Sequence, residues 1–206
     1  MGRSSIVTSQ DPFPELHELV PIVAHRAGTD AICLSTTALL VESAKLLGIP
    51  LRPVPVSMWT KSGGSDAAST GRRGREFGLT LTDQSRDLTI GSGDWYREVG
   101  HMVAVLDGEP SVLLDASFRQ FSKFGLPDVP VLARIGVSQL ADGDSWDVAF
   151  HANGTEVRIR YWPVEADTSW LVDYRSEVAR SHELAGDIAD YLRSGGSAQQ
   201  FIANDL

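Results

Sequence analysis

The feature that most constrains the fold is a two-residue turn, Asn153-Gly154, between two runs of alternating apolar and polar residues. Asn-Gly is a favoured pair for such turns, because both central positions need a positive φ. If residue 152 pairs with residue 155, the large apolar residues of both runs share one face: Trp146, Val148, Phe150, Val157, Ile159 and Tyr161. The turn and the pattern agree, so this region is predicted to form an antiparallel hairpin.

A second hairpin is predicted from two apolar runs, 101–106 and 111–115, joined by residues 107–110. The joining segment begins with Asp-Gly, which is a strong hairpin signal between apolar runs. A three-residue turn would place His101 directly opposite Asp115, with their Cβ atoms ~4.5–5.5 Å apart. A two- or four-residue turn would put them on opposite faces. The sequence does not decide between these turn lengths.

The single cysteine, Cys33, lies at the predicted start of a helix. Thr29 or Asp30 can act as N-cap, and Gly48 followed by Pro50 marks the helix end. Backbone N–H groups of a first helical turn favour negative charge, so we expect the pKa of this thiol to be lowered. The alternative is a small buried hydrophobic residue, which is what most free cysteines are.

Other regular elements follow from apolar spacing. Helices are predicted over 14–27 and 176–193, with a kink or a second helix start at Pro21. Residues 51–58 are predicted to form a strand. Its two prolines cannot donate to a ladder, so the strand is expected to be irregular or to lie near an edge.

Residues 61–93 are rich in Gly, Ser, Asp and Arg and contain the basic cluster Arg72-Arg73-Gly74-Arg75. A segment of this length and composition predicts a flexible insertion. A solvated loop is one interpretation, and an anion-binding lid is the other.

Composition limits the class of protein. With 206 residues and 42% hydrophobic residues, the chain suits a single α+β domain over 1–206. The single cysteine excludes an internal disulfide and fits a reducing cytoplasm. The net charge of −9 argues against nucleic-acid and anionic-membrane partners. The sequence has no phosphate loop, dinucleotide fingerprint or zinc-ligand spacing, so we expect no cofactor and no metal.

Three residues could form a catalytic triad. A nucleophilic thiol needs an imidazole to take its proton, and the imidazole needs a carboxylate or amide to orient it. Cys33 opens a helix, His101 opens a strand and Asp115 ends the partner strand. In the alternative interpretation, His101 is only a hydrogen-bonded strand residue and Asp115 caps a turn. The remaining histidines are less suitable partners, because none lies in an apolar strand paired with a carboxylate: His17, His25, His151 and His182.

The motifs around these residues resemble a known superfamily. Residues 33–50, which end in Leu-Gly-Ile-Pro, resemble the cysteine helix of bacterial transglutaminase-like proteins. Residues 100–105 and 113–117 resemble their histidine and aspartate strands. The same papain-like superfamily contains the arylamine N-acetyltransferases, to which residues 114–118 and 126–132 are similar.

This resemblance implies a papain-like, transglutaminase-like core, with the cysteine helix packed on an antiparallel sheet and followed by a hairpin and a helix. It implies that Cys33 is the nucleophile, His101 the general base and Asp115 the orienting residue. The expected reaction is acyl transfer through a thioester, to water (amide or peptide hydrolysis) or to an amine. The expected partner is a peptide, a protein or a small amide or acyl compound.

Two alternatives remain. One is a CoA-dependent acetyltransferase, although residues 28–32 differ from the Arg-Gly-Gly that precedes the cysteine in that branch. The other is a non-catalytic transglutaminase-like module that binds a protein or peptide. For an enzyme, the backbone N–H of Cys33 is the expected first oxyanion donor, and the second cannot be assigned. Trp59 and Trp95 are the candidates for substrate binding at the pocket wall.

Overall fold

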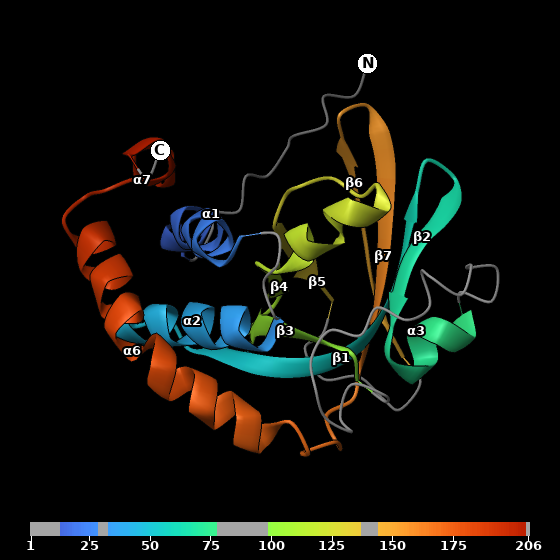
Figure 1. Cartoon of the computed structure of the whole chain (residues 1–206), viewed down its shortest axis with the longest axis horizontal. Coiled ribbons are helices and arrows are strands. Elements are labelled where there is room, and N and C mark those ends of the chain that lie inside the picture. Colours follow the sequence, from blue (N-terminus) through green and yellow to red (C-terminus); the bar gives the residue numbers. More distant parts are fainter. Residues whose placement is uncertain (1–12, 29–32, 78–98, 137–143, 205–206) are drawn as a thin grey trace.

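The computed structural model describes residues 13–28, 33–77, 99–136 and 144–204 (Figure 1). The strands are β1 (Leu51–Ser62), β2 (Ser65–Thr70), β3 (His101–Leu106), β4 (Ser111–Asp115), β5 (Val131–Ile135), β6 (Trp146–Ala152) and β7 (Thr155–Pro163). The helices are α1 (Glu15–Ala27), α2 (Cys33–Leu46), α3 (Gly71–Phe77), the 3₁₀ helix η1 (Phe118–Phe124), α6 (Leu171–Arg193) and α7 (Ala198–Asn204).

The strands form one antiparallel sheet in the order β5-β4-β3-β1-β7-β6, and β2 pairs with β1 beside this path. The two end strands, β5 and β6, also contact each other, so the sheet curls until it is nearly closed. The predicted α+β class and antiparallel sheet are confirmed.

The hairpin predicted at Asn153-Gly154 is confirmed in register. Ala152 pairs with Thr155, and the pairing continues to Trp146 with Tyr161. Asn153 and Gly154 have φ values of 52° and 79°, as a turn with two positive φ values requires.

The hairpin of β3 and β4 has the predicted strands but a wider turn. Leu106 pairs with Val112, so five residues separate the paired positions, more than in any of the turn lengths that the sequence left open. The hydroxyl of Ser111 closes the wider loop: it accepts a hydrogen bond from the N–H of Gly108 and donates one to the Gly108 carbonyl. Because the number of residues between the paired positions is odd, His101 and Asp115 point to the same face of the hairpin, as they would with a three-residue turn.

Helix α2 ends where the sequence predicts. The N–H of Ile49 donates to the Ala44 carbonyl and that of Gly48 donates to the Lys45 carbonyl, with Gly48 at φ 81°. This is the hydrogen-bond pattern of a Schellman cap. Helix α1, by contrast, runs as one helix through Pro21, because its apolar face packs into the core along its whole length.

Strand β1 is central over half of its length. Residues 56–62 pair with β7, while residues 51–56 pair with β3. Pro53 and Pro55 lie in the half that has β3 as its one ladder partner, so their missing N–H groups cost no ladder bond on the β7 side. The prediction of an edge strand therefore holds for this half and is wrong for the other.

The prediction of one long loop at 61–93 is wrong for residues 61–77. Gly63 and Gly64, both with positive φ, turn the chain from β1 into β2, and α3 follows directly. A Cβ at Gly74 would lie 2.0 Å from the carbonyl oxygen of Met58, so α3 lies directly against the backbone of β1. The basic cluster is thus part of a packed helix, and residues 78–93 lie outside the described residues.

The sheet has a large apolar core on each face. Helices α1, α2, α6 and α7 cover one face and lie together on one side of the molecule (Figure 1). The other, inner face encloses a second core that η1 closes. A smaller cluster around Cys33 joins the start of α2 to the start of α6.

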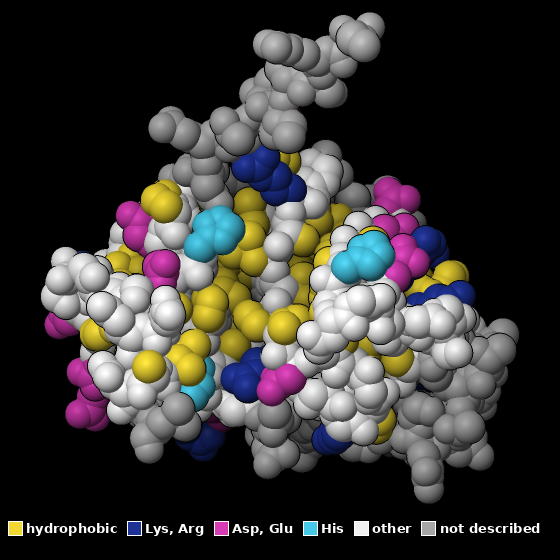
Figure 2. All heavy atoms as spheres, turned by 90° about the horizontal axis from the view of Figure 1, so that it is seen from above, with side chains coloured by type: hydrophobic (Ala, Val, Ile, Leu, Met, Phe, Trp, Pro, Cys, Tyr) yellow, Lys and Arg dark blue, Asp and Glu magenta, His cyan; other side chains and the backbone are white. Residues whose placement is uncertain are grey.

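Most large apolar side chains are buried. Among the described residues, the exposed ones are Phe77 and Val172. Figure 2 shows further hydrophobic side chains at the bottom of a hollow near the middle of one face. None of the described helices combines the length and apolar composition that crossing a bilayer requires.

Candidate active site

Cys33 is the first residue of α2, and it is fully buried. Helix α2 lies against β3, where the Thr37 hydroxyl donates to the Met102 carbonyl at 3.1 Å. This packing brings the start of α2 to the start of β3. The Cys33 side chain there lies close enough to His101 to raise the pKa of the imidazole.

His101 and Asp115 share one face of the hairpin. Extending the pairing of Leu106 with Val112 puts His101 opposite position 117, so Asp115 is its diagonal neighbour on the same face. The Nε2 atom of His101 lies 2.7 Å from Oδ2 of Asp115, and both side chains are buried. The contact expected from the sequence therefore forms across a diagonal rather than directly opposite.

Asp115 is held by further donors. Its Oδ1 accepts hydrogen bonds from the N–H and the hydroxyl of Ser117, at 3.1 and 3.0 Å. Its Oδ2 also accepts a bond from the Tyr161 hydroxyl at 3.1 Å. Burial and the neighbouring carboxylate raise the pKa of Tyr161 well above its ordinary value, so it remains a donor. The carboxylate is therefore fixed in place by groups from β3, β7 and its own turn.

The second ring nitrogen of His101 faces Gln120. The amide nitrogen of Gln120 lies 3.2 Å from Nδ1 of His101, and the Phe121 ring packs edge-on against the imidazole. A carboxamide can present either its N–H or its carbonyl to a ring nitrogen. Gln120 can thus form a hydrogen bond with Nδ1 of His101 whether or not this nitrogen carries a proton.

The surroundings of His101 favour its charged form. Burial is the largest single influence and lowers the pKa of His101, but the charges and hydrogen bonding of Asp115 and Cys33 together outweigh it and raise the pKa from 6.5 to about 10. An imidazolium held beside a thiol is the arrangement that stabilises a thiolate.

The three residues nominated as a triad therefore lie together, and sequence reasoning missed their supporting residues. Ser117 had a detectable signal, because a hydroxyl two residues after Asp commonly closes a turn. Tyr161 was expected on the apolar face of its hairpin, but nothing local indicated that its hydroxyl reaches Asp115. Gln120 had no local signal.

The Trp59 side chain points to the face of the sheet opposite that of His101. Val56 pairs with His101 and shares its face, and faces alternate along a strand, so Trp59 points to the outer face. There it contacts Phe77 of α3, with ring centroids 5.0 Å apart. The structure does not bring Trp59 to the cysteine, and Trp95 lies outside the described residues.

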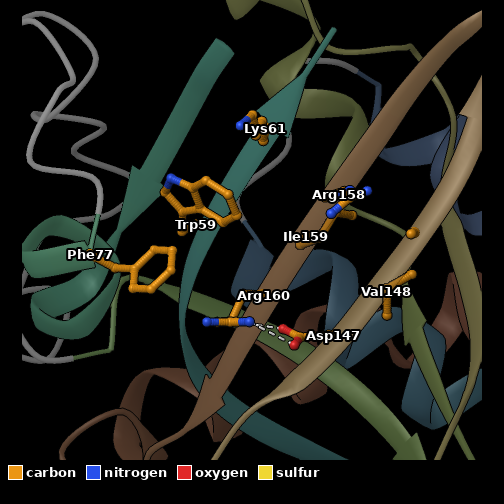
Figure 3. Close-up of a pocket in the computed structure, with 9 residues that line it drawn as sticks. Trp59, Lys61, Phe77, Asp147, Val148, Arg158, Ile159 and Arg160 are labelled. Atoms are coloured by element: carbon orange, nitrogen blue, oxygen red, sulfur yellow. Dashed lines mark hydrogen bonds and ion pairs between the residues drawn. The ribbon is translucent and has the colours of Figure 1, made fainter. Parts of the chain in front are cut away.

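Trp59 instead lines a separate pocket of about 300 Å³ on this outer face (Figure 3). Figure 3 shows the guanidinium of Arg160 held by the carboxylate of Asp147, with N–O distances of 2.5 and 2.7 Å. The remaining labelled side chains that line the pocket are aromatic, cationic or aliphatic: Trp59, Lys61, Phe77, Val148, Arg158 and Ile159.

The other histidines lie outside the apolar cluster around Cys33. His17, His151 and His182 are exposed, and His25 is half-buried in α1. Within the described ranges, no group of three or more His, Cys, Asp or Glu side chains is arranged to hold a metal ion.

Fold and site together describe an α+β protein whose curled antiparallel sheet carries a buried Cys-His-Asp arrangement. No family model matches the chain, and the searches of curated proteins and of solved structures found no match either. The chemistry of the site is therefore argued from its own geometry.

Proposed function

We propose that the protein is a cysteine-dependent acyl-transfer enzyme with a transglutaminase-like, papain-like core. Cys33 is the nucleophile, His101 the general base and Asp115 the residue that orients the imidazole. One observation carries the proposal: Cys33 contacts His101, and His101 contacts Asp115, although the three residues come from separate elements. A carboxylate that contacts an imidazole, which in turn contacts a thiol, is the usual arrangement for activating a cysteine nucleophile.

The reaction would proceed in two halves. The Cys33 thiolate attacks the carbonyl carbon of the substrate, and the carbonyl electron pair moves to oxygen. When the tetrahedral intermediate collapses, the leaving amine takes a proton from His101 and a thioester on Cys33 remains. Water or an amine then attacks the thioester and loses a proton to His101, and the thiolate is expelled. Asp115 accepts the Nε2–H bond throughout, which leaves Nδ1, the nitrogen that Gln120 also contacts, to exchange the proton.

The substrate is expected to be a peptide, a protein or a small amide or acyl compound, with water or an amine as acceptor. A second candidate is a non-catalytic module that binds a protein or peptide. The observation that favours it is that Cys33 and His101 both have 0% exposed surface. A substrate must reach the sulfur for catalysis, whereas a binding module has no such need.

Alkylation of Cys33 by iodoacetamide across pH separates the two candidates. A thiolate paired with imidazolium should react well below the unperturbed cysteine pKa of ~8.5. His101→Ala should abolish the acid-side reactivity, because the cation beside the sulfur is lost. Asp115→Asn should reduce it less, since its amide oxygen can still orient the ring.

His151→Ala is the matched control, because it removes an exposed histidine that pairs with Glu156 near the turn of the last hairpin. Its alkylation profile should match that of the unaltered protein. Should the unaltered protein alkylate only above about pH 8, and His101→Ala make no difference, the binding module is the better description.

A further inference from the structure

Thr70, the last residue of β2, has a buried hydroxyl without a hydrogen-bond partner among the described residues. The residue is 2% exposed. An unpaired buried hydroxyl costs free energy, and native proteins retain few of them. Valine would fill nearly the same volume without that cost, so packing alone does not account for threonine at this position.

The sheet register places this hydroxyl beside the candidate active site. Thr70 pairs with Met58 and His101 pairs with Val56, while β7 occupies the other side of β1 at these positions. Strands β2 and β3 therefore lie end to end along one side of β1. The spacing of two residues on β1 puts the Cα atoms of Thr70 and His101 roughly 6.6 Å apart.

The two side chains also share a face. Val56 and Met58 both point into the inner core, and side chains directly opposite each other in a pair point to the same face. The side chains of Thr70 and His101 are therefore neighbours on the inner face of the sheet.

Backbone packing holds this arrangement. A Cβ at Gly100 would lie 2.2 Å from the backbone nitrogen of Gly71 and 2.9 Å from the carbonyl carbon of Thr70. The chain just before His101 thus lies directly against the end of β2, and Gly100 has the positive φ that favours glycine. Thr70 is positioned relative to His101 by main-chain contact.

We propose that Thr70 is a further substrate-contacting residue of the Cys33 site, and that its hydroxyl donates a hydrogen bond to the carbonyl oxygen of the acyl group that Cys33 takes up. The inference rests on the proposed acyl-transfer function. A carbonyl oxygen bound beside His101 would supply the acceptor that the hydroxyl lacks. The backbone N–H of Cys33 would be the first donor to the oxyanion, and the Thr70 hydroxyl would be the second.

The test uses Thr70→Val and Thr70→Ser in the full chain, with p-nitrophenyl acetate as acyl donor. Thr70→Val should lower kcat/KM by about a hundredfold, as loss of an oxyanion donor does. Its melting temperature should stay the same or rise, because an unpaired buried hydroxyl is removed. Thr70→Ser should restore most of the activity, since it keeps the donor.

Ser43→Ala is the matched control, because Ser43 is another buried, unpartnered hydroxyl and lies in α2 ten positions after Cys33. This variant should keep the unaltered kcat/KM. Unchanged turnover in Thr70→Val would overturn the assignment of Thr70. A parallel loss of activity and melting temperature that Thr70→Ser does not restore would overturn it as well, in favour of a purely structural role.

Failure of the proposed function is recognised separately. Release of p-nitrophenol that persists in Cys33→Ala, or the absence of acid-side alkylation of Cys33 in the unaltered protein, contradicts acyl transfer at this cysteine altogether. When the unaltered protein passes both checks, the activity of Thr70→Val tests the contact with Thr70 alone.

Discussion

Asp115 accepts hydrogen bonds on both carboxylate oxygens, from Ser117 on one and from His101 and Tyr161 on the other. A buried carboxylate is tolerated when its lone pairs are satisfied in this way. The Tyr161 hydroxyl comes from β7, and so it also ties the strand of the last hairpin to the candidate site. At the scale of the residue, the orientation of His101 thus depends on side chains outside the triad.

Tyr161→Phe should lower the free energy of unfolding by about 1.5–3 kcal/mol, because it removes a buried hydrogen bond to a charged acceptor. Tyr191→Phe is the comparison: the Tyr191 hydroxyl donates to the neutral carbonyl of Ser197. That change should cost about 0.5–1.5 kcal/mol. Urea denaturation of both variants measures the difference. Equal losses would show that the bond to Asp115 has no special strength.

At the scale of the element, α3 is positioned by its contact with β1. Gly74 has no room for a side chain, because the Met58 carbonyl oxygen occupies the space of its Cβ. Phe77 then covers Trp59 and Trp162 on the outer face, with ring centroids 5.0 and 5.3 Å apart. A short helix with a basic surface is thereby held on the sheet.

Gly74→Ala should destabilise the protein by about 1–3 kcal/mol, because α3 must move away from β1 to admit a methyl group. Gly186→Ala provides the opposite case. Gly186 lies in α6, and nothing lies within 4 Å of its added Cβ. The alanine should stabilise α6 by up to about 1 kcal/mol through helix propensity. Thermal unfolding measures both changes, and a stabilising Gly74→Ala would contradict the close contact.

At the scale of the whole molecule, the raised pKa of His101 links stability to pH. The folded protein holds this proton up to a pKa of about 10, whereas an unfolded chain releases it near 6.5. The stabilisation is therefore complete below about pH 6.5 and is lost as pH rises toward 10. An unperturbed cysteine in an unfolded chain ionises in the same range, with a pKa of ~8.5, so a Cys33→Ala background isolates the histidine.

In Cys33→Ala, we expect the free energy of unfolding to fall as pH rises above 6.5, by at most about 1.4 kcal/mol per pH unit. The fall should end below pH 10, because the contribution of Cys33 to the raised pKa of His101 is absent. Adding Asp115→Asn should flatten this dependence, because the charge that most raises the pKa of His101 is removed. Urea denaturation at several pH values provides the measurement. Stability that stays constant over this range in Cys33→Ala would contradict a protonated His101 in the folded protein.

Much of the local structure follows from the sequence alone. The turn at Asn153-Gly154 and the cap at Gly48 depend on φ values that few residues adopt, so neighbouring residues suffice to predict them. The strands of His101 and Asp115 follow from apolar runs, and an odd turn between them was one of the arrangements that the sequence allowed. The three nominated triad residues could therefore be chosen before their contacts were known.

Only the tertiary structure decided what surrounds those residues. Tyr161 reaches Asp115 across 46 positions, and Arg-rich residues 71–77 form a helix because they pack on β1. Gln120 reaches His101 because η1 closes the inner face of the sheet, and Thr70 lies near His101 because β2 and β3 both pair with β1. Local propensity cannot specify such contacts, because their free energy comes from burial between segments that are distant in sequence.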